Sequence, residues 1–474
     1  MSNSLMGDKE PDISGRQHDP RENGKTKKAP QFVAAFAVNI AYIITGTVIG
    51  WTSPTLPILE GPNSPIPINK EESSWIASLM PVGAVLGPFA AGYTAEKFGR
   101  KNSLLLSVIP SLVSWIVLAT VKSIPVIYAA RFVAGFAVGW IFTVVPIYGG
   151  EIADKTVRGA ILSASQLFIV FGLLFEYCIG PYVPYAWLSI GGALIPLLFA
   201  VIFWWMPESP YYYLSVGEKG KAEKSLQWLR GKWEGESYEL IDIQASVEKA
   251  KCEKGSFKDI FATRGNTKAF IISLGLVTFQ QFSGINIVLF YSQSIFEKAG
   301  GSLKPEESAI VIGVIMMLAS CVTPLVVDRV GRKTLLILSA TGMIIAHATL
   351  GLCFFLDMTG VKTTALNFLP LVAVIGYIII YSFGFGPLPW SVMGEMFPSN
   401  IKSLASAITA SYCWILAFLI TRFFNDIVDT FGSHYTFWLF GVCCVLAVIF
   451  VYFLLPETKG KSLSEIQRIL NNSS

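Results

Sequence analysis

The chain has 474 residues, of which 53% are hydrophobic and only 14% are charged. Soluble domains carry about 25% charged residues, so this composition excludes a soluble globular protein and indicates one that crosses a membrane many times. The net charge of +4 does not indicate a nucleic-acid partner, because Lys and Arg are spread over short connections between apolar runs.

In chain order, residues 1–30 are polar and basic and are expected to form a disordered cytoplasmic tail. Residues 207–268 form a polar linker with helix-like stretches around Lys219–Trp228 and Tyr238–Lys251, and residues 456–474 form a second cytoplasmic tail. The apolar runs long enough to span a bilayer are twelve, at 31–52, 74–95, 103–121, 124–148, 159–181, 184–206, 269–297, 306–328, 334–356, 366–390, 401–424 and 433–455. We therefore predict an all-α membrane protein with six transmembrane helices in 31–206, six in 269–455 and a cytoplasmic helical linker between them.

The distribution of Lys and Arg sets the orientation of these spans. With both termini and the linker on one side, the basic residues of the other side are Lys70, Lys122, Lys298, Lys304 and Lys362. Positive charge collects on the cytoplasmic side of membrane proteins, so both termini are predicted to be cytoplasmic.

The two sets of six spans repeat each other. Gly92–Lys101 (GYTAEKFGRK) follows the second span, and Asp328–Lys333 (DRVGRK) follows the eighth. A glutamate ends the fourth and the tenth span, Pro-Glu-Ser follows the sixth, and Pro-Glu-Thr follows the twelfth. Three matched motifs in the same order indicate a duplication, and transporters with two parallel halves place their site between them.

The seventh span carries an unusual polar load. Within Phe279–Phe296 it contains Gln280, Gln281, Ser283 and Asn286, with Gly284 in the middle. An amide without a partner in hydrocarbon costs several kcal/mol, so such residues face a cavity, a ligand or another helix. Hydrogen bonds between helices are the alternative, but amides at helical spacing favour a polar substrate path, and a mid-span glycine suits a helix broken around a site.

Taken together, the motifs resemble the sugar-porter family of the major facilitator superfamily over residues 31–463, and within it the insect facilitated trehalose and glucose transporters. The residues that carry the resemblance are Gly92…Gly99-Arg100-Lys101, Arg131…Gly135…Gly139, Pro146…Glu151…Arg158-Gly159, Pro207-Glu208-Ser209-Pro210, Gln280-Gln281-Phe282-Ser283-Gly284-Ile285-Asn286, Asp328-Arg329…Gly331-Arg332-Lys333, Gly386-Pro387-Leu388-Pro389-Trp390, Glu395-Met396-Phe397-Pro398 and Pro456-Glu457-Thr458-Lys459-Gly460.

The resemblance implies which residues surround a sugar: Gln166, Gln280, Gln281, Asn286, Tyr291, Trp390 and Trp414. The chemistry fits, because carboxamides donate to and accept from sugar hydroxyls, and a Trp face packs against a sugar ring. For Trp390 a structural role is the alternative, since Pro387 and Pro389 make the helix irregular there.

The chain departs from the family pattern at several positions. Phe290 stands where the family often has a second Tyr, and Met316 stands where many members have Asn or Gln. Ser382 and Ala417 replace more polar residues, and Tyr211 replaces the usual Arg. The C-terminal half of the site is therefore expected to be less polar than in the family.

Charged residues gather at the cytoplasmic ends of the spans and are predicted to form a conformational clamp. They are Glu96, Arg100, Lys101, Glu151, Arg158 and Glu208 in the first half, and Asp328, Arg329, Arg332, Lys333, Glu395, Lys402 and Glu457 in the second. Ion pairs among them would close the cytoplasmic face when the site opens outward.

The predicted function is facilitated diffusion of a neutral sugar, trehalose or a hexose, because residues 31–59 contain no Asp or Glu that could couple protons. Glu176 is the exception: it lies on the fifth span towards the outer mouth, where Arg131 or Arg422 could pair with it. A proton-coupled sugar or polyol symporter and a non-transporting sugar sensor remain alternatives.

Several other classes are disfavoured. The chain has no nucleotide-binding loop, so ATP is not expected as a partner, and an enzyme is not expected, because His18, His347 and His434 form no plausible cluster. His347 is expected to be a hydrogen-bonded residue within a helix. The seven cysteines lie mostly in apolar runs and predict neither disulfides nor a metal site. We expect no cofactor, and as partners only a neutral sugar and the bilayer of the cell membrane.

Overall fold

The computed structural model of the chain describes residues 28–154, 157–231, 238–252, 256–299, 303–360, 368–459, 461 and 463–472. Over these residues, twelve segments are helical, long enough and apolar enough to cross a membrane, which confirms the predicted all-α fold with twelve spans. Of the predicted disordered tail, residues 1–27 lie outside the described part, and the first helix begins at Ala29.

Six spanning segments precede the linker and form the N-terminal half. They are α1 (Ala29–Gly50) continued by α2 (Thr52–Glu60), α3 (Lys70–Lys97), α4 (Arg100–Thr120), α5 (Ile124–Ile152), α6 (Arg158–Ile179) with the 3-10 turn η2 (Gly180–Tyr182), and α7 (Tyr185–Trp204). The first span runs past its predicted end at residue 52, because Trp51 keeps helical backbone angles between α1 and α2.

Six further spanning segments form the C-terminal half. They comprise α11 (Arg264–Phe282), α12 (Ile285–Phe290), α13 (Ser292–Ala299), α14 (Pro305–Val330), α15 (Arg332–Met358), α16 (Leu369–Phe383), α17 (Leu388–Met396), α18 (Ser399–Phe431) and α19 (Ser433–Leu454). The apolar run predicted as one span at 269–297 is divided into α11, α12 and α13, and the tenth span is divided between α16 and α17. Gly284 lies between α11 and α12, and Gly384, Gly386 and Pro387 lie between α16 and α17, where the regular helical hydrogen bonding stops.

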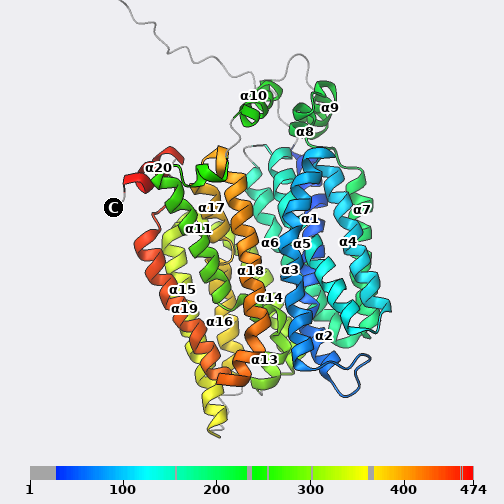
Figure 1. The fold of residues 1–474 in the computed structure, drawn as a ribbon, viewed down its shortest axis with the longest axis vertical. Helices are drawn as coiled ribbons and strands as arrows, with labels where there is room; N and C mark the ends of the chain where they lie inside the picture. Colours follow the sequence, from blue (N-terminus) through cyan, green and yellow to red (C-terminus); the bar gives the residue numbers. More distant parts are fainter. Residues whose placement is uncertain are drawn as a thin grey trace, which may run out of the picture.

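Short helices lie at one end of the bundle (Figure 1). The linker forms α8 (Pro210–Ser215), α9 (Lys219–Arg230), α10 (Tyr238–Cys252) and the 3-10 turn η3 (Phe257–Ile260), and α20 (Leu463–Asn472) follows the last span. Helices α9 and α10 lie where the sequence predicts them. We call this end of the bundle, where α8–α10 lie, the linker end, and the opposite end, where α2 and α13 lie, the far end.

The linker is held to the N-terminal half by Arg230. Its Nη1 donates to the carbonyl of Ile152 at the end of α5 over 2.8 Å, and its Nη2 lies 2.8 Å from a carboxylate oxygen of Glu239 on α10. One buried guanidinium therefore joins a spanning helix to two linker helices.

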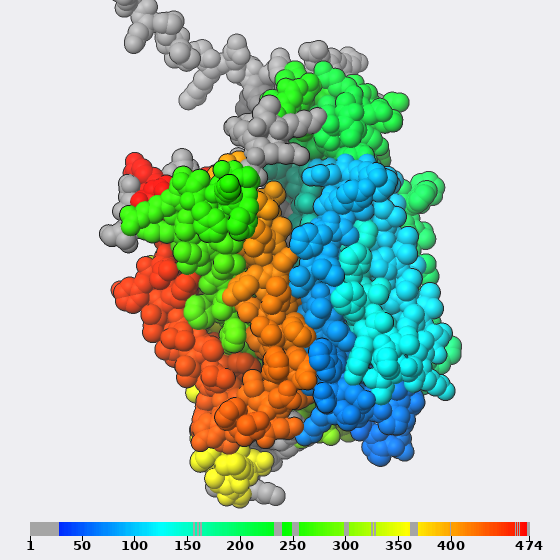
Figure 2. All heavy atoms as spheres, in the orientation of Figure 1, coloured from blue at the N-terminus to red at the C-terminus, as the bar shows by residue number. Residues whose placement is uncertain are grey.

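The halves meet mainly where α18 packs along α3 and where α14 packs along α6. Figure 2 shows the first of these contacts, with α18 against α3 towards the far end. At the linker end the same view shows the surface hollowed between the two halves. The interface is thus closed towards the far end and hollowed at the linker end.

Candidate functional site

The seventh span breaks in the middle of its polar stretch. Gly284 has a φ of +84°, a left-handed conformation that residues with a side chain rarely adopt. α11 therefore ends at Phe282 and α12 begins at Ile285. The break places Gln280 and Gln281 in the last turn of α11, and Asn286 in the first turn of α12.

Gln280 connects this break to the break in the tenth span. Its side chain is buried, and its Nε2 donates to the carbonyls of Phe385 and Gly386, at 2.6 and 2.9 Å. Both carbonyls belong to the segment between α16 and α17, where helical donors are missing. One amide thus satisfies two carbonyls that the neighbouring break leaves open.

Gln281 and Asn286 form a second chain of polar contacts. The Asn286 Nδ2 donates to Gln281 Oε1, and Gln281 Nε2 donates to the Sγ of Cys413 on α18 over 2.8 Å. Gln281 is buried, whereas Asn286 is half-buried. Carboxamides that bond each other in this way can exchange those bonds for the hydroxyls of an uncharged ligand.

Aromatic residues lie on the helices around these amides. Trp414 of α18 meets Phe142 of α5 across the interface, with ring centroids 5.7 Å apart. Trp390 of α17 is 37% exposed. Tyr291 is buried instead, and its hydroxyl donates to the carbonyl of Thr421 on α18 over 3.4 Å.

The remaining predicted ligand, Gln166, lies half-buried on α6 of the N-terminal half. The structure therefore brings Gln280, Gln281 and Asn286 together at one break and places Gln166 on the other half. Two of the departures from the family pattern, Met316 and Ala417, are buried apolar side chains.

At the far end, polar side chains of α3 and α18 join the two halves. The Lys70 Nζ lies 3.2 Å from Asp429 Oδ1, and the Asn425 Nδ2 donates to Ser74 Oγ over 2.9 Å. A hydrogen bond from a side chain to the backbone also joins the halves: the Tyr177 hydroxyl of α6 donates to the carbonyl of Leu289 on α12 over 2.5 Å. Helices of both halves are thereby held against each other.

Arg422 of α18 takes part in the same contact. Its guanidinium lies over the ring of Trp75 at 4.8 Å, and its Nη2 lies 3.7 Å from Glu71, so it faces two residues of α3. Its Nη1 also lies 3.0 Å from Asp426 of its own helix.

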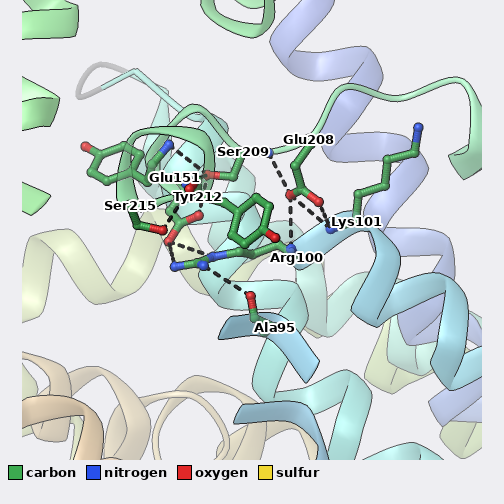
Figure 3. A network of polar contacts seen from close by, with 9 residues as sticks. Ala95, Arg100, Lys101, Glu151, Glu208, Ser209, Tyr212 and Ser215 are labelled. Atoms are coloured by element: carbon green, nitrogen blue, oxygen red, sulfur yellow. Dashed lines mark hydrogen bonds and ion pairs between the residues drawn. The ribbon is translucent and has the colours of Figure 1, made fainter. Parts of the chain in front are cut away.

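At the linker end, the N-terminal half contains a closed ring of polar contacts (Figure 3). Arg100 donates from Nε and Nη2 to Glu151 Oε1, at 3.1 and 2.8 Å. Glu208 accepts from the backbone N–H groups of Arg100 and Lys101 at 3.0 Å. The Ser209 hydroxyl donates to the other oxygen of Glu151, which closes the ring.

The C-terminal half repeats this arrangement at the equivalent positions. Arg332 donates to Glu395 Oε1 at 3.2 and 3.0 Å, and Glu457 accepts from the N–H groups of Arg332 and Lys333, each at 3.0 Å. Thr458 takes the place of Ser209, but its buried hydroxyl and the Oε2 of Glu395 have no hydrogen-bond partner among the residues described. The second ring is therefore open.

Two glycines let each carboxylate approach a helix N-terminus. Gly99 and Gly331 have φ of +96° and +101°, and each precedes the first residue of a helix. A Cβ at Gly99 would lie 2.2 Å from Glu208 Oε2, and one at Gly331 would lie 2.9 Å from Glu457 Oε2. The negative charge sits at the positive end of the helix dipole in both halves.

The two carboxyls differ in their electrostatic environment. Burial raises the pKa of Glu208, although the N–H groups of Ser209 and Lys101 act in the opposite direction. Burial also acts upward on Glu457, but the backbone N–H groups that it accepts from, first that of Lys459, together hold its pKa below the ordinary value. The pKa is thus lowered for the more exposed carboxyl and raised for the buried one.

Arg158 makes a contact that the sequence did not predict. Its side chain interacts electrostatically with Tyr211, the residue that replaces the usual Arg, and its Nη2 donates to the carbonyl of Ala153 over 3.3 Å. A tyrosine hydroxyl therefore lies close to this cation where the family pattern has a second cation.

The other predicted clamp residues lie at the same end. Glu96 at the end of α3, Arg329 at the end of α14 and Lys402 at the start of α18 are exposed, and Lys402 interacts electrostatically with Glu395. The side chain of Asp328 lies outside the described part of the structure.

A buried charged group lies in the N-terminal half near the far end. Arg131 of α5 is fully buried, donates to the carbonyls of Ile76 and Val48 at 3.2 and 3.0 Å, and lies over the Trp51 ring at 4.9 Å. Glu176 is also fully buried and interacts electrostatically with Arg131, while neither of its oxygens has a hydrogen-bond partner among the described residues. The alternative partner, Arg422, binds acidic residues elsewhere.

Sequence reasoning missed the groups that the amides bind. The run Gly384-Phe385-Gly386-Pro387 predicts an irregular helix, and this signal could have located the two open carbonyls. Nothing in the sequence marks Cys413 as a partner of Gln281, because the pairing depends on how α18 packs against α11.

Comparisons with known proteins agree on one family. A profile described as "Sugar (and other) transporter" matches residues 25–470. The facilitated trehalose transporter Tret1 of Bombyx mori is 36% identical over 445 residues, which cover 94% of this chain and 87% of that protein. Tret1 of Polypedilum vanderplanki is 36% identical, with 92% and 87% covered. The chain spans 55% of Tret1 of Aedes aegypti, at 35% identity.

Solved structures share the fold. The proton:xylose symporter XylE bound to 6-bromo-6-deoxy-D-glucose is 25% identical with a TM-score of 0.75, covering 93% of this chain and 99% of that one. The inward-open xylose transporter XylE from E. coli is 23% identical with a TM-score of 0.78, over the same shares of both chains. The expected resemblance is confirmed: this chain belongs to the sugar transporter family, as a multi-pass membrane protein of the major facilitator fold.

Proposed function

We propose that this chain carries a small neutral sugar, trehalose or a hexose, across the cell membrane by facilitated diffusion. The relatives named as facilitated trehalose transporters, which are about one-third identical over nearly the whole chain, support this function. No nucleotide or other cofactor takes part in the proposed cycle.

The observation that carries the proposal is the uncharged amide cluster at the two helix breaks. Gln280, Gln281 and Asn286 supply several donors and acceptors and no net charge. A charged substrate would lose its hydration there without a compensating charge, whereas a sugar exchanges hydroxyl hydrogen bonds with water for equivalent bonds with amides. Gln166 and the Trp390 ring are the proposed contacts from the remaining helices, with Trp414 and Tyr291 beside them.

Transport would proceed by alternating access between the two halves. In the conformation described, α3 and α18 close the far end and the linker end is hollowed. The Lys and Arg distribution supports a cytoplasmic linker end, so this conformation is the inward-facing one. In the outward-facing conformation, the charged residues of the linker end would meet across the two halves and form the clamp.

Uptake of labelled trehalose and labelled glucose into oocytes, with and without an inward proton gradient, tests the proposal. Gln281→Leu removes a central donor and acceptor at nearly constant volume and should lower uptake at low sugar concentration about tenfold or more. Gln227→Leu, which removes a half-buried amide of linker helix α9, is the matched control and should transport normally. Wild-type protein at the surface without uptake of either sugar would contradict the proposal and favour a sensor.

A second function, proton-coupled sugar symport, is favoured by one observation. Glu176 is a fully buried carboxyl beside Arg131, and buried acids in transporters often carry coupled protons. In this case uptake would rise with the inward proton gradient, and Glu176→Gln would remove that rise. Gradient-independent uptake in the wild type decides for facilitated diffusion.

A further inference from the structure

Two helices outside the seventh span donate hydrogen bonds to one carbonyl at its break. The Nε2 of His347 on α15 lies 2.8 Å from the carbonyl oxygen of Ser283, and the hydroxyl of Tyr377 on α16 lies 2.9 Å from the same atom. Both side chains are fully buried. A carbonyl oxygen accepts two hydrogen bonds, so this pair satisfies Ser283 completely.

The break in the helix creates the need for these donors. In an unbroken helix the Ser283 carbonyl would accept from the N–H four residues on, but Gly284 turns the chain away and α12 begins anew. An open carbonyl inside a membrane protein costs several kcal/mol. His347 can donate only when its ring proton is on Nε2, which leaves Nδ1 as an acceptor without a partner among the described residues.

Ring packing fixes the histidine in this position. The His347 ring lies 5.0 Å from the Tyr377 ring and 5.8 Å from the Phe440 ring, measured between centroids. Phe440 also covers the break itself, since a Cβ at Gly284 would lie 3.0 Å from its ring. Residues of α15, α16 and α19 thus surround the point at which the seventh span turns.

The anchored carbonyl lies between the amides of the candidate site. The Ser283 hydroxyl donates to the carbonyl of Gln280 over 2.7 Å and lies 3.1 Å from the Tyr377 hydroxyl. Asn286 follows three residues later on α12. A displacement of Ser283 would therefore move Gln280 and Asn286 relative to each other.

We propose that His347 and Tyr377 are positioning residues for the sugar: they hold the Ser283 carbonyl and thereby set the geometry of Gln280, Gln281 and Asn286. Neither residue needs to touch the ligand. This inference rests on the proposed function, but the anchoring of the break can be measured without any sugar.

The experiment compares purified variants in lipid nanodiscs. His347→Phe and Tyr377→Phe each remove one donor and keep an aromatic ring, and the double variant removes both. His347→Gln places an amide N–H close to the original Nε2 and should restore the contact. His434→Phe makes the same substitution at another buried histidine, in α19 at the far end, and is the matched control.

Two quantities are measured: the dissociation constant of trehalose or glucose, and hydrogen exchange of the peptide spanning residues 281–288 in sugar-free protein. Each single variant should weaken sugar binding about fivefold, and the double variant about ten- to a hundredfold, because the buried carbonyl then loses every donor. Exchange at the break should rise in the same order, while His347→Gln and His434→Phe stay close to wild type.

The proposal is overturned if the variants exchange and bind like the wild type, or if exchange rises while sugar affinity is unchanged. If His347→Phe does not fold, Tyr377→Phe, which loses a single oxygen, decides the question alone. Failure of the wild type to bind either sugar would contradict the proposed function, and the exchange measurement would still test the anchor.

Discussion

The two ends of the interface between the halves are built from different contacts. At the far end, Asn425 and Asp429 of α18 bind Ser74 and Lys70 of α3, so the contacts cross the interface. At the linker end, the ion pairs Arg100–Glu151 and Arg332–Glu395 each join two helices of the same half. The far-end contacts are therefore the ones that must separate in a transport cycle, whereas the linker-end ion pairs can stay intact.

The strengths of these contacts agree with such a division. The Lys70 and Asp429 side chains are 66% and 51% exposed, and exposed ion pairs contribute about 0–1 kcal/mol. Arg100 and Glu151 are 18% and 15% exposed, and hydrogen bonds to charged groups of this kind contribute about 1.5–3 kcal/mol. A weak ion pair across the interface and stronger ion pairs within each half suit two rigid bodies that rock against each other.

The largest effect is expected from locking the far end. Ser74→Cys with Asn425→Cys, in a background with Ser at Cys178, Cys252 and Cys321, places two thiols where a 2.9 Å hydrogen bond joins the halves. Cross-linking them with a short bifunctional reagent should abolish nearly all sugar uptake, because the far end can then no longer open.

The matched controls are the two single-cysteine variants treated with the same reagent, which should keep their uptake. A cleavable reagent should give recovery on reduction. Full uptake by quantitatively cross-linked protein would show that the far end does not need to open.

A smaller effect is expected from the ion pairs inside each half. Glu151→Gln and Glu395→Gln should each lower the free energy of unfolding by about 1–3 kcal/mol. The loss should be larger for Glu151→Gln, because Glu151 also accepts from Ser209 and the corresponding Thr458 does not donate to Glu395 among the residues described. Thermal unfolding in detergent measures this order.

Uptake by these two variants sharpens the comparison. Both should transport more slowly and still reach the surface, since the fold of each half persists. Unchanged melting temperature and uptake in both variants would mean that these ion pairs are solvated surface charges.

A still smaller effect is expected from the exposed pair at the far end. Asp429→Asn should shift the equilibrium towards the conformation with an open far end by no more than about fivefold, which corresponds to the largest free energy that an exposed ion pair contributes. Raising the salt concentration should reduce the difference from wild type, because exposed charges are screened. A large, salt-independent effect would contradict this assignment.

The smallest effect concerns pH. Burial raises the pKa of Glu208, so the folded protein binds this proton more tightly than the unfolded chain, and the stabilising contribution is lost as pH rises through the raised pKa. For Glu457 the backbone N–H groups outweigh burial and lower the pKa, so its contribution is present above the ordinary carboxyl value and lost as pH falls through the lowered pKa.

The melting temperatures of wild type, Glu208→Gln and Glu457→Gln, measured between pH of about 7 and about 4, test these signs. On acidification, the difference in melting temperature between wild type and Glu208→Gln should change in favour of the wild type. The difference between wild type and Glu457→Gln should change in favour of the variant. Parallel curves for the two variants would refute the difference between the halves.

Much of the fold could be predicted from the sequence, because apolar length and repeated motifs depend on local chemistry. The apolar runs of sufficient length predicted the number of membrane spans. The paired motifs around Arg100 and Arg332 predicted that these residues are equivalent, and in the structure each forms the same kind of ion pair. Gly284 marked the point at which the seventh span breaks.

The partners of these residues could not be predicted, because they depend on the packing of distant helices. Nothing near Gln281 points to Cys413, and nothing near His347 points to the Ser283 carbonyl. The pairing of charges within one half rather than across the interface also depends on how the helices of that half pack.

The central claim is that the two halves rock so that one end of the interface opens as the other closes. Spin labels at the exposed residues Lys122 and Tyr435 report the far end, and labels at the exposed residues Lys97 and Ser403 report the linker end. Distances measured between the labels of each pair, with and without sugar, should show two populations at each end. A short far-end distance should accompany a long linker-end distance. Sugar should change the ratio of the two populations at both ends together. Single, sugar-independent distances at both ends of protein that transports sugar would contradict the account.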